Sequence, residues 1–279
     1  MDTPQTQHMD NAALDAYLAR IGYHGPREPT LDVLKAVHLA QAQAIAFENF
    51  EPLLNRPVPI DLPALQDKLI THKRGGYCFE INTLFCAALR ALGFVVTPLL
   101  ARVQWMAPPT HVAARTHMVL RVDLNGTSYI ADAGFGAVTL TGPIILQTET
   151  PQRTPHEMFR LIAMGADELQ LQVRLKNEWV RMYQFSLVPP PQIDFEVGNF
   201  FVWAYPESHF RKVLMASHVE AGKRFTLGNL TLTTRQVNGD TAQHEIESSD
   251  EFADVLRNVI GTQISKADAE AVFEKLKSV

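Results

Sequence analysis

Residues 74–92 read RGGYCFEINTLFCAALRAL: Gly75-Gly76 break the chain, and a strongly apolar helix follows from Tyr77 to Leu92. Because Cys78 opens this helix, free N–H groups and the helix dipole stabilise an anion at its sulfur. The two glycines let the backbone approach a ligand closely and leave N–H groups available to an oxyanion. This local pattern leaves two interpretations of Cys78 open, a nucleophile and a small core residue.

The hydrophobic period of the chain changes on either side of this helix. Before it, helical spacing predicts three helices, over residues 11–21, 31–41 and 63–71. After it, alternation and β-branched residues predict strands over residues 94–104, 117–124, 128–133 and 169–175. The last part is mixed: a rigid Pro189–Pro191 link, an aromatic-rich stretch at 195–217, strand at 225–236, and helices at 250–260 and 266–277. The predicted order is therefore helical, then β, then α/β.

Composition excludes several classes of protein. The 279 residues carry a net charge of −5, which gives no basic surface for nucleic acid, and no apolar run is long enough to span a membrane. Met1–Asn11 is polar, so no secretory signal is predicted. The chain has two cysteines, Cys78 and Cys86, eight residues apart in one predicted helix, which disfavours a disulfide and makes the cytoplasm the expected location. Cys86 is interpreted as a core residue.

A nucleophilic thiol needs a base, and the base needs an orienting group. His117 begins an alternating strand that Asn125-Gly126 fold back as a hairpin. With a two-residue loop, Val119 lies opposite Asp132, and His117 lies diagonal to Asp132 on the same face, about 7–8 Å away at Cα. A three-residue loop would place the two on opposite faces. A purely structural His–Asp pair remains open at this point.

Five segments carry a resemblance to a known family. They are the nucleophile segment RGGYCFEINTLF (74–85), Phe47-Glu48-Asn49, His117-Met118, DAGFG (132–136) and, more loosely, NFFVWAYPESHF (199–210). Taken in the order in which they follow along the chain, and with these flanks, the segments make the chain resemble the arylamine N-acetyltransferases. Ala46 stands where that family often has proline, and Ala133 stands where it usually has valine.

The resemblance implies an α+β, multi-part fold with a cysteine-protease-like Cys-His-Asp core. Its parts would be a helical bundle (1–95), a central antiparallel β-barrel (96–203) and a C-terminal α/β lid (204–279). It also implies Cys78 as nucleophile, His117 as base and Asp132 as the group that holds the imidazole.

The same resemblance implies acetyl-CoA as donor, an aromatic amine or hydrazine as acceptor, xenobiotic metabolism as the setting, and no metal. The aromatic walls of the substrate site would be Phe47, Phe135 and Phe210. The donor contacts would be Thr116, Gly134 and Gly136. Lys212, Lys223 and Arg224 could meet the CoA phosphates, with solvated surface charge as the alternative. A homodimer is left open.

The expected reaction is ping-pong acetyl transfer through an acetyl-cysteine. A cysteine amidase or transglutaminase-like acyl transferase could use the same three residues, and is the main alternative. A zinc-binding module built on Cys78, His117 and Asp132 is weaker, because the chain has no C-x-x-C pair and no evident fourth ligand. A catalytically inactive CoA-binding protein is the third alternative.

Overall fold

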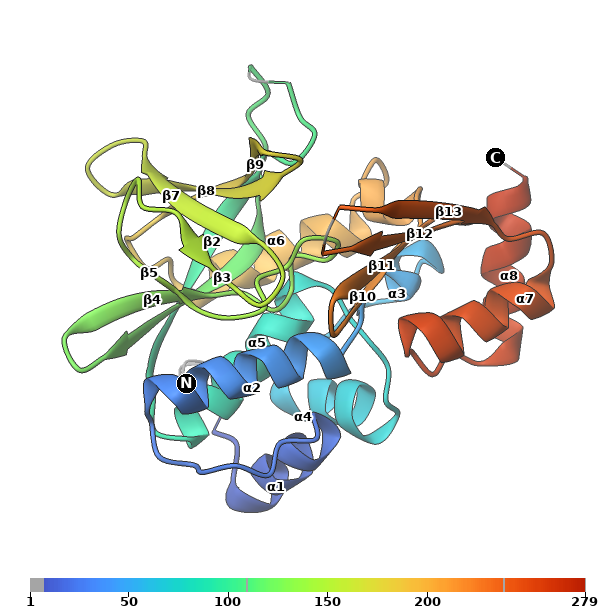
Figure 1. Ribbon diagram of the computed structural model, residues 1–279. Coiled ribbons are helices and arrows are strands. Elements are labelled where there is room, and N and C mark those ends of the chain that lie inside the picture. The colour runs from blue at the N-terminus through green and yellow to red at the C-terminus, as the bar shows by residue number, and fades with distance from the viewer. Residues whose placement is uncertain (1–7, 109, 238, 279) are drawn as a thin grey trace.

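The N-terminal part of the computed structural model is helical (Figure 1). The structure describes residues 8–108, 110–237 and 239–278. The predicted lack of a secretory signal concerns Met1–Asn11, and residues 1–7 of that stretch lie outside the described residues. The helices here are α1 (Asn11–Arg20), α2 (Leu31–Ala44), α3 (Phe50–Leu53), α4 (Leu62–Leu65) with its π-helical continuation Gln66–Thr71, and α5 (Cys78–Ala91).

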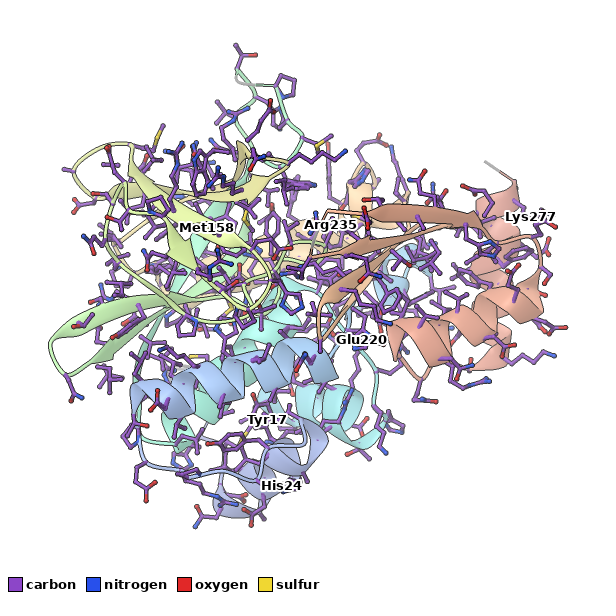
Figure 2. All side chains as sticks on the ribbon, in the orientation of Figure 1. Tyr17, His24, Met158, Glu220, Arg235 and Lys277 are labelled. Carbon is purple, nitrogen blue, oxygen red and sulfur yellow. The ribbon has the colours of Figure 1, made fainter. Side chains whose placement is uncertain are left out.

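Side-chain caps explain where the first helices begin. Asp10 Oδ1 accepts the amide N–H of Ala13 at 2.8 Å, and Thr30 Oγ1 accepts that of Val33 at 3.3 Å. Tyr17, labelled in Figure 2, is fully buried and donates its hydroxyl to Gln41 on α2. These contacts confirm the helices predicted before the Gly75-Gly76 break.

An antiparallel eight-stranded sheet follows, in the order β5-β4-β3-β2-β9-β8-β7-β6. Its two edge strands are joined where the Gln152 side chain of β6 donates to and accepts from the backbone of Ile145 on β5, at 2.8 and 2.6 Å. The sheet therefore curls into a nearly closed barrel. Its strands are β2 (Val95–Val103), β3 (Arg115–Leu124), β4 (Thr127–Ala131), β5 (Ile144–Ile145), β6 (Gln152–Arg153), β7 (Met158–Ala163), β8 (Glu168–Leu175) and β9 (Glu178–Ser186).

The β3–β4 hairpin has the predicted register. Leu124 pairs with Thr127, and the ladder continues to Leu120 opposite Ala131. Asn125 and Gly126 have φ values of 49° and 78°, the left-handed conformation that a two-residue hairpin loop requires. The chain reaches Asp132 one residue beyond β4, so the hairpin itself brings this carboxylate beside His117.

A second sheet and two C-terminal helices complete the fold. The sheet has the order β1-β10-β11-β12-β13, so β1 from the N-terminal part pairs with strands from the end of the chain. Residues 225–236, predicted as strand, form parts of two strands joined by a turn at Asn229 (φ 50°). The elements are β1 (Phe47–Glu48), β10 (Met215–Glu220), β11 (Lys223–Gly228), β12 (Thr231–Gln236), β13 (Thr241–Glu245), α7 (Ser249–Val255) with its continuation Leu256–Ile260, and α8 (Lys266–Lys277).

One helix, α6 (Gln192–Ala204), has no counterpart in the sequence prediction. It begins directly after Pro191 and buries Phe195, Gly198 and Val202. Its opposite side is also apolar, with Val197 and Phe200 each 61 % exposed. Apolar residues on both sides hide the helical period in the sequence. A short 3-10 turn at His209–Arg211 follows.

Each layer has its own core. α5 is buried along nearly its whole length among the N-terminal helices and β3, a second cluster fills the barrel, and a third lies between the second sheet and α7–α8. Among residues 8–108, 110–237 and 239–278, no helix is both long enough and apolar enough to cross a bilayer.

Candidate active site

Cys78 is the first residue of α5, as predicted, and lines a cavity of about 530 Å³. Its thiol lies 3.5 Å from the carbonyl oxygen of Thr116 on β3. The close fit around it depends on Gly134, where an added Cβ would lie 2.9 Å from Cys78 Cα. The helix terminus and the DAGFG turn are thus in direct contact, although 54 residues or more separate them in the chain.

The prediction that Gly75 and Gly76 offer free N–H groups is wrong. Gly75 donates to Thr262 Oγ1 at 3.1 Å, and Gly76 donates to the Ala46 carbonyl at 3.2 Å. Their small size instead lets the loop pack closely, since a Cβ at Gly75 would lie 2.3 Å from the Ala46 oxygen. The first amide of α5, that of Cys78 itself, has no acceptor among the described residues.

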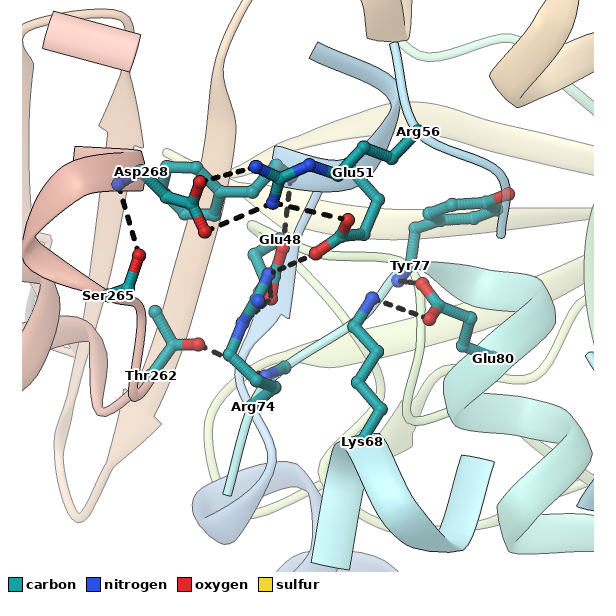
Figure 3. A network of polar contacts seen from close by, with 12 residues as sticks. Glu48, Glu51, Arg56, Lys68, Arg74, Tyr77, Glu80, Thr262, Ser265 and Asp268 are labelled. Atoms are coloured by element: carbon teal, nitrogen blue, oxygen red, sulfur yellow. Dashed lines mark hydrogen bonds and ion pairs between the residues drawn. The ribbon is translucent and has the colours of Figure 1, made fainter. Parts of the chain in front are cut away.

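A buried ionic network holds the loop before Cys78 (Figure 3). Arg74 binds Glu48 at 2.8 Å and Glu51 at 3.0 Å. Glu80 accepts the Tyr77 amide at 3.1 Å and pairs with Lys68 at 2.6 Å. Burial raises the pKa of Glu80, and the Lys68 ammonium opposes that rise.

This network extends to the end of the chain. Arg56 pairs with Asp268 of α8 at 2.5 Å, and the Gln263 amide donates to the Lys73 carbonyl at 3.3 Å. Together with the hydrogen bond from the Gly75 amide to Thr262, these contacts hold the loop before Cys78 (residues 73–77, the nucleophile loop) against the C-terminal segment. The C-terminal segment therefore helps to position the loop that carries Cys78.

His117 and Asp132 form a buried pair. His117 Nε2 lies 2.8 Å from Asp132 Oδ2, and the two residues are 2 % and 0 % exposed. Burial lowers the pKa of His117, but the Asp132 charge and hydrogen bond, together with a hydrogen bond to Cys78, outweigh it and raise this pKa to about 10. The imidazole is therefore cationic at neutral pH.

Asn82 is a site residue that the sequence analysis missed. Its side-chain amide donates to Asp132 Oδ1 at 2.8 Å and to the Met118 carbonyl at 2.7 Å, and its oxygen accepts the Ala133 amide at 3.1 Å. Burial alone would raise the pKa of Asp132, but His117 and the hydrogen bonds from Asn82 and Gly134 lower it. A polar residue one turn after Cys78 in an apolar helix was the available signal.

Aromatic rings enclose the imidazole. The ring centroid of His117 lies 4.7 Å from that of Tyr183 and 5.3 Å from that of Phe135. Tyr183, on β9, was also missed, because nothing in its local sequence connects it to residue 117. These rings keep water away from the imidazole and hold its plane.

The remaining predicted site residues all line the Cys78 cavity. These are Phe47, Phe135, Phe210, Thr116, Gly134 and Gly136. Phe47 and Phe210 contact each other edge to face, with centroids 6.2 Å apart. Gly136 has a φ of 91°, and an added Cβ would lie 3.3 Å from the Phe47 ring. Trp105 and Met106, which the sequence analysis did not single out, complete the apolar side of the cavity.

The three cations considered for CoA phosphates are all paired with carboxylates. Arg224 is 2 % exposed and binds Glu157, so a surface role for this residue is wrong. Lys212 and Lys223 pair with Glu207 and Glu220. In the part of the chain that the structure describes, no group of three or more His, Cys, Asp or Glu side chains is arranged to hold a metal ion.

The arrangement supports nucleophilic catalysis by a thiol. Cys78 and a cationic His117 both line an apolar cavity. The buried Asp132 carboxylate binds Nε2 of the imidazole. The first amide of α5 is available to an oxyanion at the same place.

Comparison with known proteins agrees with this geometry. A family model described as N-acetyltransferase matches residues 30–269. The chain is 38 % identical over 267 residues to arylamine N-acetyltransferase of Escherichia coli (strain K12), covering 95 % of this chain and 94 % of that protein. It is 43 % identical over 221 residues to the arylamine N-acetyltransferase / N-hydroxyarylamine O-acetyltransferase of Salmonella typhimurium, covering 79 % and 78 %.

Solved structures give the same result. The arylamine N-acetyltransferase of Mycobacterium marinum superposes with a TM-score of 0.90 at 40 % identity, covering 94 % of this chain and 99 % of that one. The same protein in complex with CoA matches equally well. The α+β, multi-part fold expected from the sequence is confirmed by these neighbours. By sequence and by fold, this chain belongs to the arylamine N-acetyltransferase family.

Proposed function

We propose that this chain transfers an acetyl group from acetyl-CoA to arylamines and hydrazines through an acetyl-Cys78 intermediate. The observation that carries the proposal is the buried 2.8 Å pair of His117 and Asp132 beside the Cys78 thiol. The roles are Cys78 as nucleophile, His117 as acid and base, and Asp132 as the group that keeps the imidazole charged and oriented.

In the first half-reaction, the Cys78 sulfur attacks the thioester carbonyl of acetyl-CoA. The Cys78 amide stabilises the oxyanion, and one such donor is typically worth about 3–4 kcal/mol of barrier. The bond between the carbonyl carbon and the CoA sulfur then breaks, and His117 gives its proton to the departing thiolate. CoA leaves as the free thiol, and His117 is left neutral.

In the second half-reaction, neutral His117 acts as the base. An arylamine or hydrazine is mostly unprotonated at neutral pH, so its lone pair can attack the acetyl carbonyl. His117 takes the proton that the amine loses, and the Cys78 sulfur leaves. The products are the N-acetylated amine and the thiolate–imidazolium pair, ready for another acetyl-CoA.

The cavity suits both substrates. Phe47, Phe135 and Phe210 form aromatic walls that can hold a ring and exclude water from the acetyl group. Thr116, Gly134 and Gly136 line the same cavity as the thiol and are the proposed donor contacts. The structure of the M. marinum relative in complex with CoA supports a CoA substrate here.

The proposal also covers the location, the setting, the oligomeric state and the division of the chain. The chain acts in the cytoplasm on foreign amines, either as a monomer or as a homodimer. Its three parts are residues 1–95, 96–203 and 204–279. The β1–β10 pairing shows that the first and third parts share a sheet, so we expect them to unfold together.

The test is a panel of acceptors assayed with acetyl-CoA. Anilines and hydrazines should be acetylated, whereas alkylamines, mostly protonated at neutral pH, should react far more slowly. An N-hydroxyarylamine belongs in the panel because the name of the Salmonella relative includes that acceptor. Cys78→Ala serves as the control. Hydrolysis of a peptide or simple amide without acetyl transfer to any amine would favour the amidase alternative instead.

A further inference from the structure

A second cavity, of about 250 Å³, lies against a different face of α5 from the Cys78 site. Thr83, Cys86, Ala87 and Arg90 line it at positions i, i+3, i+4 and i+7, which is one stripe of the helix. Among the described residues, none that lines this cavity also lines the Cys78 cavity. In Figure 1, α5 lies between the N-terminal helices and the barrel strands, which supply the opposite wall.

This cavity touches the residues next to the candidate triad. Met118 lines it and directly follows His117, and neighbouring side chains of a strand point to opposite faces. The Met118 carbonyl accepts the Asn82 amide at 2.7 Å, and Asn82 also holds Asp132. A molecule bound in the second cavity would therefore contact Met118, next to His117 on β3, without entering the Cys78 cavity.

The lining points to one chemical class of ligand. Most of the wall is apolar, with Ala87, Val96 and Phe195 among its members, and Cys86 and Met118 add two polarisable sulfurs that favour an aromatic ring. Thr83 donates its hydroxyl to the Met118 sulfur at 3.5 Å, a weak acceptor that a ligand oxygen would replace.

Arg90 gives the cavity its charge. Its guanidinium donates to the Val96 carbonyl at 2.8 and 3.3 Å, which fixes it at the edge of the cavity and leaves further N–H groups for an anion. Among the described lining residues Arg90 is the charged one, and none is a carboxylate. An anionic ligand would thus meet attraction without opposing repulsion.

We propose that this cavity is a second binding site, for a small aromatic carboxylate, behind the candidate triad. Drug-sized ligands occupy roughly 300–1,000 Å³, so a cavity of about 250 Å³ fits a molecule built on a single ring. The ring lies against Cys86 and Met118, and the carboxylate lies between Arg90 and Thr83.

Benzoate is the probe, and the Cys78→Ser chain is the protein, because Cys86 is then its one remaining thiol. Benzoate binding is followed by ligand-observed NMR and by the rate at which methyl methanethiosulfonate modifies Cys86. We expect saturating benzoate to slow Cys86 modification about fivefold or more, and benzyl alcohol, which lacks the charge, to bind about tenfold more weakly.

Two variants separate this site from the Cys78 cavity. Arg90→Gln should weaken benzoate binding about tenfold, whereas Arg27→Gln, the same charge change at an exposed position, should leave it unaltered. Ala87→Leu fills the cavity and should abolish binding. Because Arg90 is exposed, we expect Arg90→Gln to fold. Its benzoate affinity therefore tests the proposal even if the Ala87→Leu chain does not fold.

Three results would overturn the proposal. They are unchanged Cys86 modification in the presence of benzoate, equal benzoate affinity of the Arg90→Gln chain and the parent chain, and full binding in a folded Ala87→Leu chain. The last result would place benzoate in the Cys78 cavity. Since these assays use a chain without the nucleophile, they stand whether or not acetyl transfer is established.

Discussion

His117 Nε2 and Asp132 Oδ2 lie 2.8 Å apart in an environment that solvent hardly reaches. An isolated imidazole buried in this way would be neutral, and the carboxylate reverses that preference. The Asp132 carboxylate therefore keeps the His117 imidazole protonated beside Cys78. That proton is the one that the departing CoA thiolate needs.

Asp132→Asn should remove this charge while keeping the shape of the side chain. The pKa of His117 should fall, because burial lowers it and only the interactions with Cys78 then oppose that decrease. We expect the rate of Cys78 acetylation at pH 7 to drop by about three to four orders of magnitude. Asp123→Asn, on the same hairpin but partly exposed, is the matched control and should retain the parental rate. A tenfold loss or less in Asp132→Asn would contradict the assigned role.

The His117 charge also predicts a pH dependence of stability. A histidine whose pKa is raised on folding contributes stability that is fully present below its unfolded pKa, about 6.5. That contribution is lost as pH rises through the folded value of about 10. Urea unfolding at pH 7 and pH 10 should therefore show a larger decrease for the parent chain than for His117→Gln. Equal decreases in the two chains would mean that His117 is not cationic when folded.

Asn82 should act as a positioning residue through Asp132. Asn82→Ala removes one of the two hydrogen bonds to Asp132 Oδ1, since only the Gly134 amide remains, and leaves the buried Ala133 amide without its partner, which costs about 1–3 kcal/mol. We expect kcat to fall about tenfold or more with little change in the KM for acetyl-CoA. Asn82→Asp should be at least as harmful, since it sets a second carboxylate against Asp132. Near-parental kcat in Asn82→Asp would show that the amide does not orient the pair.

Thr262 should affect the rate of Cys78 acetylation through its hydrogen bond to the loop before Cys78. Thr262→Val keeps the volume but removes the acceptor of the Gly75 amide, at a cost of about 1–3 kcal/mol in unfolding free energy. Because this amide anchors the loop before Cys78, the rate of Cys78 acetylation should fall as well. Thr231→Val, in the second sheet, is the control. A stability loss without any change in the acetylation rate would limit Thr262 to a structural role.

The sequence was sufficient where the structure depends on local pattern. The start of α5 at Cys78 follows from the Gly75-Gly76 break, and the His117–Asp132 approach follows from the Asn125-Gly126 loop and the strand period of two. Both depend on residues close together in the chain, so their geometry could be predicted before any contact was known.

The sequence was insufficient where the partner is distant. The Gly75 amide is bonded because Thr262, 187 positions away, reaches it, and no local rule indicates that. Tyr183 comes to His117 only when β9 pairs with β2. The helix α6 escaped prediction for another reason: it carries apolar residues on its exposed side as well as its buried one.

If the acetyl group passes through Cys78, a chase experiment will detect the acetylated protein and follow the group to the amine. The protein is mixed with acetyl-CoA alone, freed of CoA, examined by intact mass and peptide mapping, and then mixed with an arylamine. We expect one acetyl group, located on Cys78, absent from Cys78→Ala, and transferred to the arylamine at least as fast as steady-state turnover. Absence of the modification, or its transfer more slowly than turnover, would contradict passage through Cys78.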